Sequence, residues 1–226
     1  MEVKMKDLYN ELLDSLKDRE ESLACCSLMV GKEYKDSDFK LLVVGRAING
    51  WEENPWKPGV SVDEYAEKVL EIGDSAFKWT NIIKPESGYN VNKSSFWRVS
   101  RDIFKGISGK NDDNWISKIA WSNLYKVSKF DGGNPSDKLC ILQLETCKKI
   151  LLKEIREIVP DLILFITDMN WFKDFNLEEF EVEETNGETI VAVGKYESTK
   201  IIVTKRPERK AENKFVNDVI SIFKQS

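Results

Sequence analysis

The stretch LLVVGRAINGW, residues 41–51, carries four aliphatic side chains directly into a loop that contains Gly45 and Gly50. A continuous apolar run is typical of a strand buried on both faces of a parallel sheet, because each face then needs apolar cover. The loop after such a strand lies at the carboxyl edge of the sheet, where open α/β sheets bind ligands. The alternative interpretation is a plain turn in which the two glycines supply backbone freedom.

Strand and helix patterns alternate along the rest of the chain. Short apolar runs predict strands within the ranges 117–127 and 161–167, and two more strands around a turn in 187–205. Apolar residues at helical spacing predict helices in the ranges 1–24, 61–72, 94–107, 138–159 and 211–223. The alternation predicts an α/β fold, a three-layer α/β/α sandwich with a mainly parallel central sheet and one antiparallel strand added near the end.

No internal repeat, low-complexity tract or linker divides the sequence. We therefore expect a single domain over residues 1–226, with the N-terminal helix, about 1–24, packed on it. Four loops follow predicted parallel strands, and such loops should meet at one edge of the sheet. These loops are the ranges 45–51, 121–126, 167–171 and 204–210.

The composition limits the chemistry. The chain contains no histidine, which excludes a hydrolase with a histidine base and a histidine-ligated zinc centre. The cysteines at 25, 26, 140 and 147 fit no paired-ligand spacing, so we expect no metal, no iron-sulfur cluster and no cofactor. The sequence has no long apolar run and starts with a polar amphipathic segment, so we expect a cytoplasmic protein with no membrane partner.

A basic segment, TKRPERK at 204–210, contrasts with the net charge of −5. The negative total argues against wholesale nucleic-acid binding, since phosphate neutralisation dominates that affinity. Lys205, Arg209 and Lys210 are nevertheless candidate phosphate-binding residues, and a solvated charged face is the alternative.

Common nucleotide-binding signatures do not fit, because GRAING at 45–50 has neither the lysine of a P-loop nor the third glycine of a dinucleotide fingerprint. The four loops in their order, however, resemble the uracil-DNA glycosylase superfamily. The matching pieces are VVGRAINGW, with Ile48 where proline is usual; AWSNL, which ends in Asn123 and Leu124; CKKILLKEIREIVPDLILFIT; and IIVTKRPERK, with Arg206-Pro207 where the family has His-Pro-Ser. The resemblance covers the range 38–222.

The resemblance implies a glycosylase-like fold and a protein that binds a nucleobase or nucleotide and hydrolyses the N-glycosidic bond of a damaged base in DNA. Asn123 would read the base edge by pairing one donor and one acceptor. Arg206 would stabilise the negative charge that develops on the departing base. Candidate ligand-binding residues are Gly45, Arg46, Ala47 and Asn49 of the first loop and the aromatic residues Trp51, Phe96 and Trp97, which offer stacking surfaces for a flat base. Single-stranded or damaged DNA is the expected macromolecular partner, because unstacking a base then costs little.

Several positions depart from the family pattern. The first loop carries Arg46 and Ala47 where a water-activating side chain is expected, and Glu52 and Glu53 are the nearest substitute carboxylates. The family histidine is replaced by Arg206, and no apolar wedge follows it. The alternative is therefore a catalytically silent relative that binds a small ligand or a protein partner. An unrelated flavodoxin-like binding domain would follow if the four loops did not converge. The oligomeric state is left open.

Overall fold

The computed structural model describes residues 3–19, 21–49, 55–74 and 90–225. Contacts divide the chain into two compact units. The first unit is Met1–Met29, Gly45–Ser75 and Ser122–Ile158, and the second is Val30–Val44, Ala76–Trp121 and Val159–Ser226. Since contacts do not report whether the units unfold together, the single domain over 1–226 stays a prediction.

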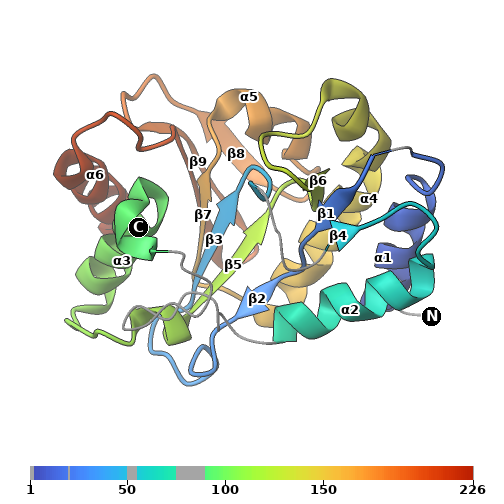
Figure 1. Cartoon of the computed structure of the whole chain (residues 1–226). Helices are drawn as coiled ribbons and strands as arrows, with labels where there is room; N and C mark the ends of the chain where they lie inside the picture. Colours follow the sequence, from blue (N-terminus) through green and yellow to red (C-terminus); the bar gives the residue numbers. More distant parts are fainter. Residues whose placement is uncertain (1–2, 20, 50–54, 75–89, 226) are drawn as a thin grey trace. The chain divides into compact units, whose positions relative to one another are not determined.

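Among the described residues, a seven-stranded mixed sheet lies mostly in the second unit. Its strand order is β2 (Met29–Val30), β5 (Ile119–Asn123), β3 (Leu41–Gly45), β7 (Leu162–Ile166), β10 (Thr199–Thr204), β9 (Ile190–Tyr196) and β8 (Glu181–Glu184). β7 pairs in parallel with both β3 and β10. Every residue of β3, β5 and β7 is buried, which the apolar runs of β3 and β7 predicted. The chain is thus a mixed α/β protein, with six α-helices among the described residues (Figure 1).

The far edge of this sheet corrects the prediction of one antiparallel strand. β9 is antiparallel to β10, and β8 is antiparallel to β9, so two antiparallel strands end the sheet. β8 has the sequence EVEE and is largely exposed, which left no apolar run to predict it. Charged side chains on an edge strand oppose pairing with another chain.

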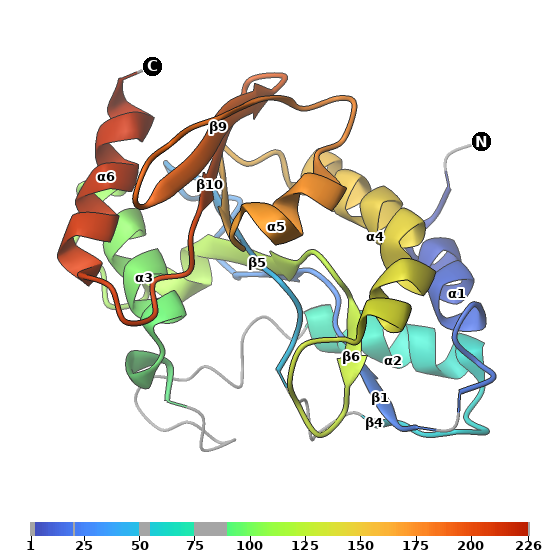
Figure 2. The ribbon, with the colours of Figure 1, turned by 90° about the horizontal axis from the view of Figure 1, so that it is seen from above.

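Helices α3 (Ser95–Ser108) and α6 (Glu212–Lys224) of the second unit lie side by side in Figures 1 and 2. They approach closely at Gly106, where an added Cβ would lie 2.3 Å from Ile220 Cδ1. Of the predicted buried side of α3, the residues Val99, Ile103 and Phe104 are buried, whereas Phe96 is half-buried and Trp97 enters the core.

An ion pair joins α3 and α6, and we expect it to make the free energy of unfolding depend on pH. Arg98 Nε donates to Glu212 Oε2 at 2.9 Å, and the hydrogen bond from Arg98 lowers the pKa of Glu212. A carboxylate with a depressed pKa stabilises the fold above its unfolded pKa and loses this effect as pH falls through the folded value. We expect Glu212→Gln to cost about 1 kcal/mol of unfolding free energy at pH 7 and less below about pH 4. Urea unfolding at pH 7 and below about pH 4 measures the loss of stability. Glu178→Gln, at an exposed position, is the control. An equal loss at both pH values would contradict the prediction.

In its described residues the first unit contains three helices. It also contains a small sheet, which the sequence patterns did not predict. The sheet has the order β4 (Pro55–Trp56), β1 (Leu23–Cys25) and β6 (Val127–Lys129), with antiparallel pairing. α1 (Met5–Asp14) contacts both α2 (Val62–Asp74) and α4 (Asp137–Ile158). α4 confirms the helix predicted for 138–159.

The N-terminal helix predicted for about 1–24 is wrong in its second half. The helix ends at Asp14, and Leu23–Cys25 forms β1. All three residues of β1 are buried, and they pair with Val127–Lys129, which follow more than a hundred residues later. This long-range pairing outweighs the local helical spacing. In the part of the chain that the structure describes, no helix is both long and apolar enough to cross a membrane.

Candidate functional site

The loops after β7 and β10 meet at the carboxyl ends of these two parallel strands, in the second unit. The Asp168 N–H donates to Thr204 O at 3.0 Å, and the Arg206 N–H donates to Asp168 Oδ1 at 3.1 Å. These two hydrogen bonds join the predicted loops 167–171 and 204–210 directly. These hydrogen bonds therefore fix the main chain at Arg206, from which its side chain extends.

Asp168 has an unusual backbone conformation, with φ 62° and ψ 157°. Any residue other than glycine disfavours this region of φ and ψ, and holding one there costs about 1–3 kcal/mol. Residues in such conformations cluster at functional sites. Its carbonyl oxygen accepts from the Phe172 N–H at 3.2 Å and from Thr167 Oγ1 at 3.2 Å. Sequence reasoning placed Asp168 in a candidate loop without naming it. An acid directly after a buried strand, before a short helix, was the signal that could have found it.

The Arg206 side chain is 45% exposed and forms an ion pair with Glu208. Lys210 Nζ donates to Arg206 O at 2.5 Å, so the lysine folds back over its own loop. Arg209 and Lys210 are exposed, whereas Lys205 is half-buried and its N–H donates to Thr189 O at 2.8 Å. The predicted phosphate-binding residues thus lie on one loop, and Glu208 offsets part of its charge.

The first unit brings the loops after β3 and β5 together. The Leu124 N–H donates to Gly45 O, and the Tyr125 N–H donates to Arg46 O, each at 2.9 Å. Asn49 Oδ1 accepts from the Gly133 N–H at 2.7 Å. Ala47 is half-buried in this segment. The first loop is therefore tied to the chain that follows Asn123.

Asn123, the predicted base reader, is only 2% exposed. Its Nδ2 donates to Cys26 Sγ at 3.6 Å, inside the first unit. Burial raises the pKa of Cys26 to about 11, so the thiol is neutral at pH 7. Base reading by Asn123 stays a prediction. Gly45 and Asn123 belong to the first unit and Arg206 to the second, so their convergence on one site stays a prediction as well.

The two aromatic candidates on α3 differ in exposure. Trp97 is 3% exposed and makes an edge contact with Trp121 at a centroid distance of 5.4 Å, which favours a packing role. Phe96 is half-buried and lies at right angles to Trp97 at 5.0 Å, so it is the better placed of the two to contact a ligand. Trp51, Glu52 and Glu53 lie outside the described residues.

A buried ion pair that sequence reasoning missed lies next to Asn123 in the first unit. Lys126 and Glu154 are both 0% exposed, with Lys126 Nζ 2.8 Å from Glu154 Oε2. Lys126 Nζ also donates to Ser122 Oγ at 2.6 Å and to Asn123 O at 2.7 Å. Among the described residues, Glu154 Oε1 has no hydrogen-bond partner. The pair fixes the end of β5 from inside the unit.

The cysteines do not assemble a metal site. Cys25, Cys26 and Cys147 are buried, and burial raises the pKa of each thiol, to about 12 for Cys147. Within the described residues, no group of three or more acidic or thiol side chains is arranged to hold a metal ion.

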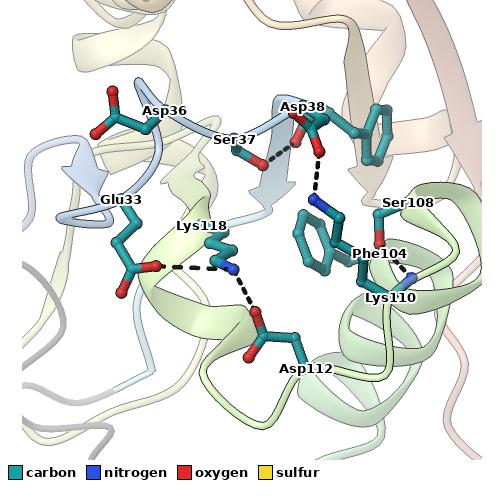
Figure 3. A pocket seen from close by; sticks show the side chains of 10 residues that line it. Glu33, Asp36, Ser37, Asp38, Phe104, Ser108, Lys110, Asp112 and Lys118 are labelled. Carbon is teal, nitrogen blue, oxygen red and sulfur yellow. Dashed lines mark hydrogen bonds and ion pairs between the residues drawn. The ribbon is translucent and has the colours of Figure 1, made fainter.

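A polar cavity of about 220 Å³ lies in the second unit at the amino ends of β3 and β5 (Figure 3). Lys118 pairs with Asp112 and, at 3.7 Å, with Glu33, while Lys110 pairs with Asp38. The hydrogen bond from Lys118 lowers the pKa of Asp112. Because carboxylates of the same walls already engage both lysines, the geometry identifies no ligand for this cavity.

The chain matches no family model, and it matches none of the curated proteins. The resemblance to the uracil-DNA glycosylase superfamily therefore rests on the quoted motifs alone.

Proposed function

We propose that this chain is a uracil-DNA glycosylase-like protein that binds a nucleobase and hydrolyses the N-glycosidic bond of a damaged base in DNA. The observation that carries the proposal is the anchoring of Arg206 to Asp168 at the carboxyl ends of β7 and β10. Breaking an N-glycosidic bond leaves negative charge on the base, and a positioned cation stabilises this charge as it develops. A guanidinium is a cation with a planar fork of donors, which suits it to this role.

The sheet order gives further support. In the second unit, β7 and β10, whose loops hold Asp168 and Arg206, are parallel neighbours. Neighbouring parallel strands bring their carboxyl-end loops to the same edge, which is where open α/β sheets bind ligands. The exposed Arg209 and Lys210 follow Arg206 on the same loop, where they would contact the phosphates of a DNA strand.

The alternative function is a catalytically silent relative that binds a small ligand or a protein partner. Two observations favour it: Asn123 is buried against Cys26, and Glu208 pairs with Arg206. Neither arrangement, as it stands, presents its polar group to a base. Activity therefore requires that a substrate displaces Glu208 from the guanidinium.

Oligonucleotides that each carry one uracil, hypoxanthine, xanthine or mismatched base test the proposal, in single-stranded and duplex form. We expect abasic sites, detected as strand breaks after alkali, for at least one of these bases. Single strands should react faster than duplexes, because no wedge follows Arg206 and unstacking a base from a duplex costs a few kcal/mol. No abasic product, together with no DNA binding at low salt, would favour the silent relative.

A further inference from the structure

Asp168 combines a disfavoured backbone with a side chain that contacts the neighbouring loop. Its φ of 62° and ψ of 157° belong to a region that glycine alone adopts readily. Neighbouring groups hold it there: its N–H donates to Thr204 O, and its carbonyl oxygen accepts from the Phe172 N–H. Thr204 is itself tied to β7, because its Oγ1 donates to Phe165 O at 3.2 Å. The conformation is thus determined from both sides.

The conformation directs the Asp168 carboxylate to one place, where Oδ1 accepts the Arg206 N–H at 3.1 Å. Glycine at this position would remove the backbone cost but would also remove this acceptor. Lys210 Nζ, at the end of an exposed side chain of the same loop, donates to the carbonyl oxygen of Arg206 and adds no tie to another element. The anchored Arg206 N–H contrasts with the guanidinium, which is 45% exposed and pairs with Glu208 of its own loop.

We propose that Asp168 is a positioning residue for Arg206: its carboxylate, held by a disfavoured backbone conformation, fixes the loop that presents the guanidinium to the departing base. This inference rests on the proposed function. Asp168 does not touch the substrate in this role, and it acts through the Arg206 main chain. An uncharged acceptor in the same place is therefore sufficient.

Three variants separate positioning from other roles. Asp168→Asn keeps a side-chain oxygen that accepts the Arg206 N–H, so it should retain single-turnover excision within about threefold of the wild type. Asp168→Ala and Asp168→Gly remove the acceptor and should lower the excision rate by about tenfold or more. The double variant Asp168→Gly/Arg206→Ala should react no more slowly than Arg206→Ala alone, because the first change acts only through Arg206.

Stability and proteolysis give readouts that need no activity. Asp168→Gly should raise the melting temperature by about 2–4 °C, since glycine accepts the backbone conformation. Tryptic cleavage after Arg209 and Lys210 should nevertheless become at least about tenfold faster in Asp168→Gly, and remain unchanged in Asp168→Asn, because the loop loses its anchor. Glu197→Gly is the matched control, as Glu197 has a φ of 52° in the turn between β9 and β10. It should gain stability without a change in cleavage or excision.

The outcomes keep the two proposals apart. If the wild type excises no base but Asp168→Gly still loosens the loop, the proposed function fails while Asp168 remains the anchor of the Arg206 loop. If Asp168→Gly leaves both tryptic cleavage and excision unchanged, the positioning role is overturned. Loss of excision in Asp168→Asn with normal cleavage would also overturn it, because the negative charge itself would then be required.

Discussion

Replacing Lys126 by Met is expected to lower the free energy of unfolding by about 3–5 kcal/mol. Glu154 is 0% exposed, and the substitution removes its cationic partner, whose Nζ lies 2.8 Å from Glu154 Oε2 in the wild type. It also removes the donor to Ser122 Oγ and Asn123 O. A buried charge without a partner costs several kcal/mol, far more than a lost surface contact. Urea unfolding at pH 7 measures the change.

The matched control, Lys149, lies on α4, the helix that also carries Glu154. Lys149 pairs with Glu11 at 2.7 Å, but both side chains are about half exposed. Lys149→Met should therefore cost no more than about 1 kcal/mol. The double variant Lys126→Met/Glu154→Leu should recover most of the stability, because an apolar pair of similar volume needs no charge compensation. Similar small losses from Lys126→Met and Lys149→Met would show that the Lys126 pair is not buried in solution.

Replacing Arg206 by Ala is expected to reduce single-turnover base excision by about 100-fold, with a much smaller effect on DNA binding. The guanidinium would interact with the base most strongly when negative charge develops, which is in the transition state. Lys210→Ala should do the reverse: weaken DNA binding and reduce the log–log salt slope by about 0.9, the contribution of one phosphate contact on duplex DNA. Excision rates at saturating protein, and binding titrations at several salt concentrations, separate the two effects.

Arg206→Lys is the conservative comparison. Lysine keeps the charge and loses the planar fork of donors, so its rate should fall between those of the wild type and Arg206→Ala. Glu208→Gln releases Arg206 from its ion pair and should not slow excision. Equal small losses of excision and binding from Arg206→Ala and Lys210→Ala would make the loop a plain electrostatic patch.

The elements that the sequence predicted well are those with a local signal. β3 and β7 are apolar runs whose residues are all buried, and α4 combines helical spacing with Pro160 just after its end. The signal failed where a strand is short or charged. β1 and β6 have three residues each, and β8 exposes its glutamates, so none of them has a run long enough to recognise.

Part of the candidate site could likewise be predicted from the sequence and part could not. The order of the loops and the basic segment at 204–210 could be read from the sequence, because strand ends and charges are local features. The environment of each side chain could not. Asn123 and Trp97, both proposed as ligand contacts, are almost fully buried, and Lys126, whose charge predicts exposure, is completely buried.

The sequence by itself determined the buried strands, the main helices and the positions of the loops that follow them, since periodicity and apolar runs depend only on neighbouring residues. The tertiary structure alone decided which polar groups are paired. Glu154 meets Lys126 from 28 residues away, and the Asp168 carboxylate meets the Arg206 N–H from 38 residues away. Such partners arise only when strands and helices distant in sequence pack together. These partners determine whether a charged side chain can be buried or stays available to a ligand. The reason is that the cost of burying a charge depends on which groups lie within hydrogen-bond distance of it.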